Sequence, residues 1–184
     1  MATISRATRI RNPALFICDI QEKFRPVIYE FSRLIPTTIK LLKAANHLQI
    51  PTYITTQNRS KLGDTISELQ PHLSTPNIKA NIDKTLFSMI TPEIESQLPK
   101  TTLDLLERGH RVYVIVDGVS SVNPEERGIA LARLRDAGAV VTSSESVLFE
   151  VLGDAGHGGF RAISGFVKEM KEETKGAMEV FSKI

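Results

Sequence analysis

Two charged residues of this sequence stand where charged groups can do chemistry. The first, Asp19, directly follows the short apolar run Ala14–Cys18. Such a run predicts a strand that is buried on both faces of a parallel sheet. Ligands of open α/β sheets bind beyond the carboxyl ends of the strands, so this carboxylate is a candidate catalytic or binding group. A helix-capping or turn role is the alternative.

The second charged residue is Lys84, which lies in the segment Ile82–Ser88 with apolar residues on both sides. This segment predicts a third strand. A lysine in such a place either extends its ammonium group into water or belongs to a site. Cys18, the single cysteine, precedes Asp19, and neighbours along a strand point to opposite faces. We therefore expect its thiol to point away from Asp19 and to be buried as a small apolar group.

Composition excludes several classes of function. The net charge is only +2 and no basic stripe is present, which argues against nucleic-acid binding. No apolar stretch approaches the roughly 20 residues of a membrane span. The four histidines show no paired ligand spacing, and no phosphate-binding loop is present, so neither a metal nor another cofactor is expected. One cysteine and no secretory signal favour the cytoplasm; the acid-free, arginine-containing start makes a mitochondrial location the alternative.

Helices and strands alternate along the chain, which predicts an α/β fold with a mostly parallel sheet. We expect residues 1–12 to be a flexible N-terminus, residues 13–170 to form one domain, and residues 171–184 to be a loosely packed tail. The expected strands after the first are Pro51–Thr56, Ile82–Ser88, Arg111–Asp117 and Ala139–Thr142. The expected helices are Pro26–Leu48 with a break or kink at Pro36, Thr65–Leu69, Thr91–Leu98, Thr101–Arg108, Asn123–Asp136, Ser144–Leu152 and His157–Lys171.

This alternation fails at one place. The helix that ends near Leu98 is followed, after Pro99 and Lys100, by another helix that begins at Thr101. The pattern calls for a strand between two such helices. We therefore expect the sheet to lack one central strand.

Four segments resemble the isochorismatase-like hydrolases, and most closely the isochorismatase domain-containing proteins: Phe16–Phe24, Lys84–Ser88, Thr101–Gly109 and Val112–Ser121. The resemblance extends from about Ala14 to Val167. It implies a three-layer α/β/α fold. It also implies that Asp19 takes the proton of a nucleophilic thiol and that Lys84 supports it electrostatically. In the family, that thiol belongs to a segment that would stand between Lys100 and Thr101, and this sequence does not contain it.

The resemblance implies a hydrolase-family protein for small amides, esters or vinyl ethers that is catalytically impaired because its nucleophile is missing. Whether the protein is an enzyme stays open. One alternative is a non-catalytic protein that binds a ligand or a partner, and another is an incomplete gene model of an active hydrolase. Gln57, after a strand end, and Phe24 are the candidate substrate-binding residues. The small-molecule ligand is unknown, and an open sheet would favour a homo-oligomer.

Overall fold

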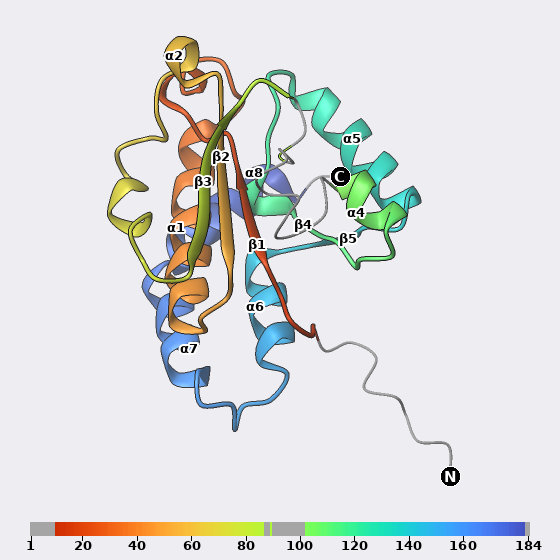
Figure 1. Ribbon diagram of the computed structural model, residues 1–184. Helices are drawn as coiled ribbons and strands as arrows, with labels where there is room; N and C mark the ends of the chain where they lie inside the picture. The colour runs from red at the N-terminus through yellow and green to blue at the C-terminus, as the bar shows by residue number, and fades with distance from the viewer. Residues whose placement is uncertain (1–9, 87–88, 90–101, 183–184) are drawn as a thin grey trace.

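The computed structural model describes residues 10–86, 89 and 102–182 of the chain (Figure 1). Its strands are β1 (Leu15–Cys18), β2 (Thr52–Gln57), β3 (Ile78–Lys84), β4 (Tyr113–Ile115) and β5 (Val140–Thr142). Its helices are α1 (Phe31–His47), α2 (Arg59–Leu62), α4 (Thr102–Glu107), α5 (Pro124–Asp136), α6 (Ser144–Leu152), α7 (Phe160–Glu169) and α8 (Lys171–Phe181). Three short 3-10 segments are η1 (Glu22–Phe24), η2 (Gln70–His72) and η3 (Val116–Gly118).

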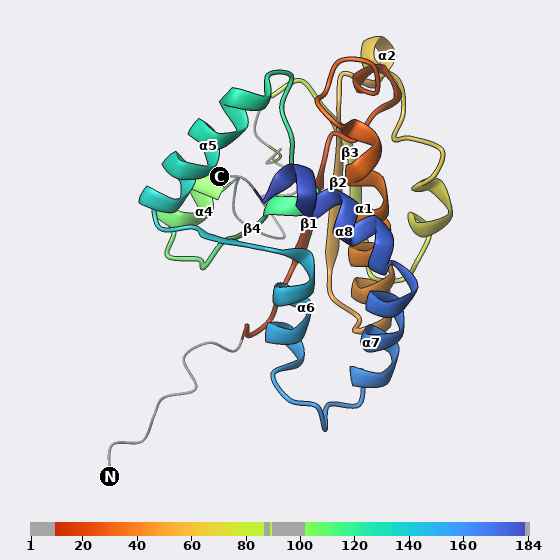
Figure 2. The ribbon, with the colours of Figure 1, turned by 180° about the vertical axis from the view of Figure 1, so that it is seen from behind.

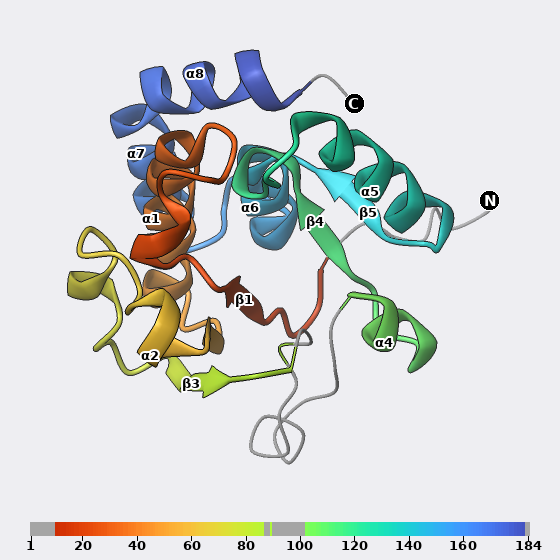
Figure 3. The same ribbon diagram turned by 90° about the horizontal axis from the view of Figure 1, so that it is seen from above.

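The elements form three layers, as the alternation along strand β4 shows. Tyr113 and Ile115 pack against an apolar cluster on α1, α6 and α7, whereas Val114 packs against a second cluster with Leu106 of α4 and Leu131 of α5. Successive side chains of a strand point to opposite faces, so these helices cover opposite faces of the sheet. Figure 3 shows α4 across the strands from α1 and α6. The predicted α/β/α architecture is confirmed.

The strands are parallel but fall into two groups. β1, β2 and β3 pair in that spatial order, and β4 pairs with β5. Leu15 of β1 and Ile115 of β4 nevertheless pack against the same cluster, so both groups rest on the same helices. Within the described residues, no strand joins β1 to β4. Among the described residues, the sheet is therefore broken at the place where a central strand was predicted to be missing.

Several predicted boundaries were wrong. Helix α1 begins at Phe31 rather than Pro26 and continues without a break through Pro36. That proline costs only the one hydrogen bond to the Ser32 carbonyl, early in the helix, and the buried residues on either side hold the helix together. Residues 65–69 do not form a helix: Thr65 makes an isolated antiparallel bridge with Gln21, and residues 67–69 form turns. The predicted helix Thr91–Leu98 lies outside the described residues.

Strand β3 begins earlier than predicted and ends at Lys84 rather than Ser88. Its first six residues alternate between half-buried and exposed, as in an edge strand with one covered face. The apolar residues Ile78, Ala80 and Ile82 alternate with polar ones, and the sequence prediction included only the last of them.

The C-terminal segment is not the loosely packed tail that was predicted. Residues 171–181 form helix α8, which contacts α1, and Figure 2 shows α8 and α7 lying against it. Ala177 and Phe181 are fully buried in the core, and the Thr174 hydroxyl accepts a 2.6 Å hydrogen bond from the buried ammonium of Lys40. The apolar residues recur at helical spacing among many charges, and that pattern was undervalued. None of the described helices combines the length and apolar character that a membrane span requires.

We expect Phe181→Ala to lower the free energy of unfolding by about 3–5 kcal/mol, because it removes a fully buried ring and leaves a cavity. Glu179→Ala, on the exposed side of the same helix, is the matched control and should change stability by less than about 0.5 kcal/mol. Urea unfolding measures both values. Equal effects of the two substitutions would mean that α8 is not part of the core in solution.

Candidate functional site

A buried ion pair stands at the carboxyl ends of the first group of strands. Asp19 directly follows β1, and Lys84 is the last residue of β3. The Lys84 Nζ lies 2.6 Å from the Asp19 Oδ2, and the exposed fractions of the two side chains are 0% and 17%. The structure therefore brings the two predicted catalytic residues together. Burying an ammonium group is costly unless a partner of opposite charge and further hydrogen bonds satisfy it.

Strand β2, which lies between β1 and β3, supplies those further hydrogen bonds. The Gln57 side-chain carbonyl accepts a bond of 2.8 Å from the Lys84 Nζ, and the Thr55 hydroxyl donates one of 2.7 Å to the Asp19 Oδ1. Thr55 and Gln57 are two residues apart, so their side chains share one face of the sheet. Gln57, predicted as a substrate-binding residue, contacts the ion pair. Thr55 was not predicted, although its position near a strand end was the available signal.

The polar side chains of this site lie on the face of the sheet that points away from α1. Ile17 and Ile54 face the core cluster on α1, and they are register partners in β1 and β2. Their neighbours Cys18 and Thr55, also register partners, therefore point to the other face. Asp19 leaves the strand in a left-handed conformation with φ 52°, and its carboxylate reaches Thr55 on that same face.

The prediction for Cys18 was therefore wrong in two respects. The residue is exposed rather than buried, and its thiol lies on the face where Asp19 and Lys84 meet. The rule of alternating faces stops applying at Cys18 because Asp19 is no longer in strand conformation. Desolvation of the sulfur by the surrounding atoms, together with the negative charge of Asp19, raises the pKa of the thiol to about 12.

Gln21 holds the loop after β1 to the end of β2. Its side chain is fully buried, accepts a 2.7 Å bond from the Gln57 N–H and donates a 2.6 Å bond to the Gly63 carbonyl. A buried amide with both ends bonded fixes the backbone around it. Gln21 therefore positions Gln57, and through it the ammonium of Lys84. Sequence reasoning missed this role, because the only clue was a glutamine two residues after Asp19.

The second predicted substrate-binding residue is directed elsewhere. Phe24 lies in η1, and its half-buried ring packs against the core cluster that contains Phe31 of α1. That cluster covers the face of the sheet opposite to Thr55 and Gln57. A contact between Phe24 and a substrate stays a prediction. Among the described residues, no group of three or more His, Cys, Asp or Glu side chains gathers as metal ligands would.

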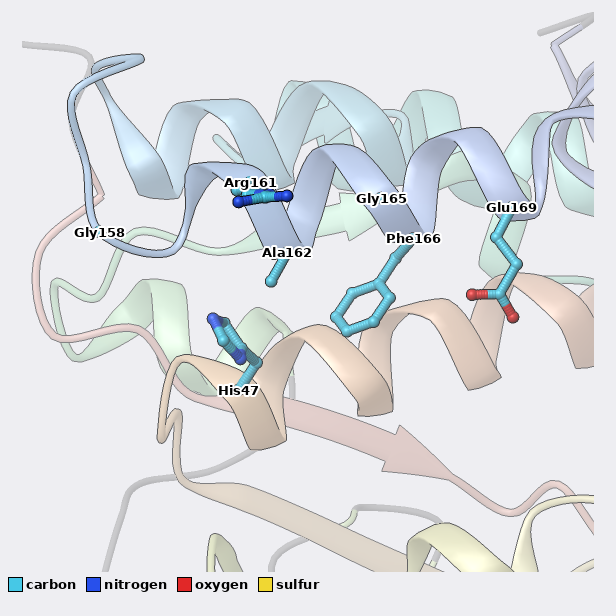
Figure 4. A pocket seen from close by; sticks show the side chains of 7 residues that line it. All are labelled: His47, Gly158, Arg161, Ala162, Gly165, Phe166 and Glu169. Atoms are coloured by element: carbon cyan, nitrogen blue, oxygen red, sulfur yellow. The ribbon is translucent and has the colours of Figure 1, made fainter.

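A separate cavity of about 600 Å³ lies between α7 and the end of α1, and Arg161, Phe166 and Glu169 contribute to its lining (Figure 4). It also contacts His47, the last residue of α1, after which the chain turns toward the amino end of β2. The cavity is therefore at the opposite end of the strands from the ion pair. Ligands of such sheets bind at the carboxyl ends, so we do not assign the site to this cavity.

Comparison with known proteins gives relatives over most of the chain. The Isochorismatase domain model matches residues 13–100 and 98–146. The secreted isochorismatase effector Isc1 of Phytophthora sojae is 36% identical over 197 residues, covering 92% of this chain and 93% of that protein. Isochorismatase domain-containing protein 2 of Xenopus laevis is 36% identical over 191 residues, covering 92% and 91%.

Solved structures share the fold. The MAR1 ribonuclease of Caenorhabditis elegans superposes with a TM-score of 0.80 at 37% identity, covering 87% of this chain and 92% of that one. The YcaC protein of Escherichia coli, described as an octameric hydrolase, superposes with a TM-score of 0.76 at 16% identity, covering 95% and 96%. The second likeness concerns the fold alone. From the matched residues and the identity with its relatives, this chain belongs to the isochorismatase family.

Proposed function

We propose that this protein is a catalytically impaired member of the isochorismatase family. It keeps the acid–base pair Asp19 and Lys84 for small amides, esters or vinyl ethers, but lacks the segment that holds the nucleophilic cysteine. The observation that carries the proposal is the break in the sheet between β1 and β4. In the chain, the missing segment would stand between Lys100 and Thr101, just before α4 and β4.

The comparisons support this position for the missing segment. The family model matches in two pieces that meet at residues 98–100, as expected if family residues are skipped there. The alignment with Isc1 spans 197 positions but includes only 92% of the 184 residues of this chain. More than a dozen of its positions therefore hold a residue of the relative and none of this chain.

The remaining residues can perform only part of a hydrolysis. The carboxylate of Asp19 can accept a proton, and Lys84 stabilises its charge at 2.6 Å. Hydrolysis through a covalent intermediate also needs a thiolate, and N–H donors that hold the oxyanion. Losing both lowers the rate by several orders of magnitude.

Cys18 is a poor substitute for the missing nucleophile. The thiolate is the reactive form of cysteine, and burial together with the charge of Asp19 raises the Cys18 pKa to about 12. Almost all of the thiol is therefore protonated at neutral pH. Its own backbone N–H points sideways along the sheet rather than toward a substrate beyond the strand end.

Two alternatives follow from the same observations. A non-catalytic protein that binds a ligand or partner would keep the polar group of Asp19 and Lys84 as a recognition element. An incomplete gene model would describe an active hydrolase whose transcript carries extra codons between Lys100 and Thr101. Sequencing the transcript across those two codons decides between this alternative and a genuine loss.

We expect no hydrolysis of a panel of small amides and p-nitrophenyl esters above the level of the Asp19→Asn variant. Inserting the aligned segment of the Xenopus laevis relative between Lys100 and Thr101 should raise the rate by on the order of 10³ or more, because it supplies a nucleophile and oxyanion donors. Asp19→Asn in the chimaera should abolish this gain. Turnover by the unaltered chain that disappears in Cys18→Ala would contradict the proposal, since Cys18 would then be the nucleophile.

The raised pKa of Cys18 predicts slow alkylation. At pH 8, iodoacetamide should modify the folded protein about 1000-fold more slowly than the urea-unfolded chain, since a pKa of about 12 instead of 9.0 leaves about 1000-fold less thiolate. Mass spectrometry follows the single thiol. Asp19→Asn removes a charge that raises this pKa and should accelerate the reaction, whereas Asp136→Asn, on an exposed helix end, is the matched control. Equal rates in folded and unfolded protein would refute the assignment.

A further inference from the structure

We propose that the break between β1 and β4 is an insertion site for one extended apolar strand supplied by another polypeptide. The inference concerns a partner rather than chemistry, and it rests on the same break between β1 and β4 as the proposed function. It follows from the direction of the backbone groups of β1 and from the apolar surface that β1 and β4 share.

The backbone of β1 offers hydrogen bonds on its outer edge. The N–H groups of Leu15 and Asp19 donate to carbonyls of the β2 side, at 2.9 and 3.1 Å. In a parallel strand, residues two apart direct their N–H and C=O groups to the same side. Phe16 and Cys18 therefore direct theirs away from β2. No described strand pairs with this edge.

Strand β4 bounds the other side of the site. It pairs with β5 along one edge, and no described strand pairs with its other edge. Leu15 of β1 and Tyr113 of β4 pack on the same cluster, to which α1 contributes Leu41 and Ala44. An inserted strand would therefore find a continuous apolar surface beneath it and a hydrogen-bonding edge on each side. Adding a strand to a free edge is a common mode of peptide recognition.

The surroundings determine the chemistry of the occupant. A strand in the middle layer of three is covered on both faces, so it must be uncharged and apolar, with β-branched residues favoured. β1 and β4 are four and three residues long, which calls for a segment of similar length. Both edges of the occupant must also be free. A folded second copy does not meet this condition, because one edge of its β1 pairs with its own β2.

The probe is a fluorescein-labelled peptide that copies the uncharged segment Val112–Val116, because this chain forms the parallel strand Tyr113–Ile115 within it. We expect its fluorescence anisotropy to rise when the full chain is added, and the amides of Phe16 and Cys18 to become protected from hydrogen exchange. The control peptide carries proline in place of Val112 and Val114 and should bind at least about tenfold more weakly, since it lacks two donors.

Two protein variants test the edge directly. Phe16→Pro removes an N–H that points away from β2, so it spares the pairing of β1 with β2. Phe16→Ala is its match, because both lose the stacking of Phe16 on Tyr53 at 5.3 Å but only the proline loses the N–H. We expect Phe16→Ala to bind the probe within about threefold of the unaltered chain and Phe16→Pro at least about tenfold more weakly. If Phe16→Pro fails to fold, the two peptides still decide.

Four results would overturn the inference. The first is no anisotropy change up to about 1 mM peptide, a concentration at which even a weak complex would form. The second and third are equal binding of the two peptides and equal binding by the two Phe16 variants. The fourth is protection of the Phe16 and Cys18 amides before any peptide is added. Sedimentation equilibrium addresses a second copy. A dimer that Phe16→Pro dissociates would place another molecule of this chain on the edge and would also exclude the proposal.

Discussion

The buried ammonium of Lys84 is the constraint on which the rest of the site depends. Its side chain is fully buried, so the protein must supply a negative charge and a hydrogen-bond acceptor within reach. Asp19 provides the charge from the end of β1, and Gln57 provides the acceptor from the end of β2. The three strands must end at the same level for these contacts to form. The left-handed backbone of Asp19 is the local conformation that accompanies this arrangement.

The same constraint explains which parts of the site could be predicted from the sequence. Asp19 stood out because it follows an apolar run at a strand end, whereas the role of Lys84 was implied by the resemblance to the isochorismatase-like hydrolases. Thr55 and Gln21 could not be found in this way, since threonine and glutamine occur in many polar loops. Cys18 was misplaced for a different reason. The alternation rule assumes strand conformation on both sides of a residue, and the backbone of Asp19 breaks that assumption.

The fold was predictable wherever the pattern was strong. The apolar runs of β1 and β4, and the helix starts of α5 and α6, gave elements close to those observed. The weak points were an edge strand with one exposed face and a C-terminal helix rich in Lys and Glu, where tertiary packing rather than local sequence decides the structure. The missing strand was predicted from two adjoining helix patterns in the sequence, the first of which lies outside the described residues. Its consequence in space, two sheets on one set of helices, needed the structure.

Helix α8 has a consequence for how the chain folds. The hydrogen bond from Lys40 to Thr174 joins residues 134 positions apart, and Phe181 enters the same core as Phe31 at the start of α1. During synthesis, α1 leaves the ribosome long before α8 is made. Until then, the ammonium group of Lys40 stays solvated or contacts other residues. Contacts between such distant residues slow folding. The nascent chain therefore spends most of its translation with an unfinished core, which is a stage at which chaperones bind exposed apolar surface.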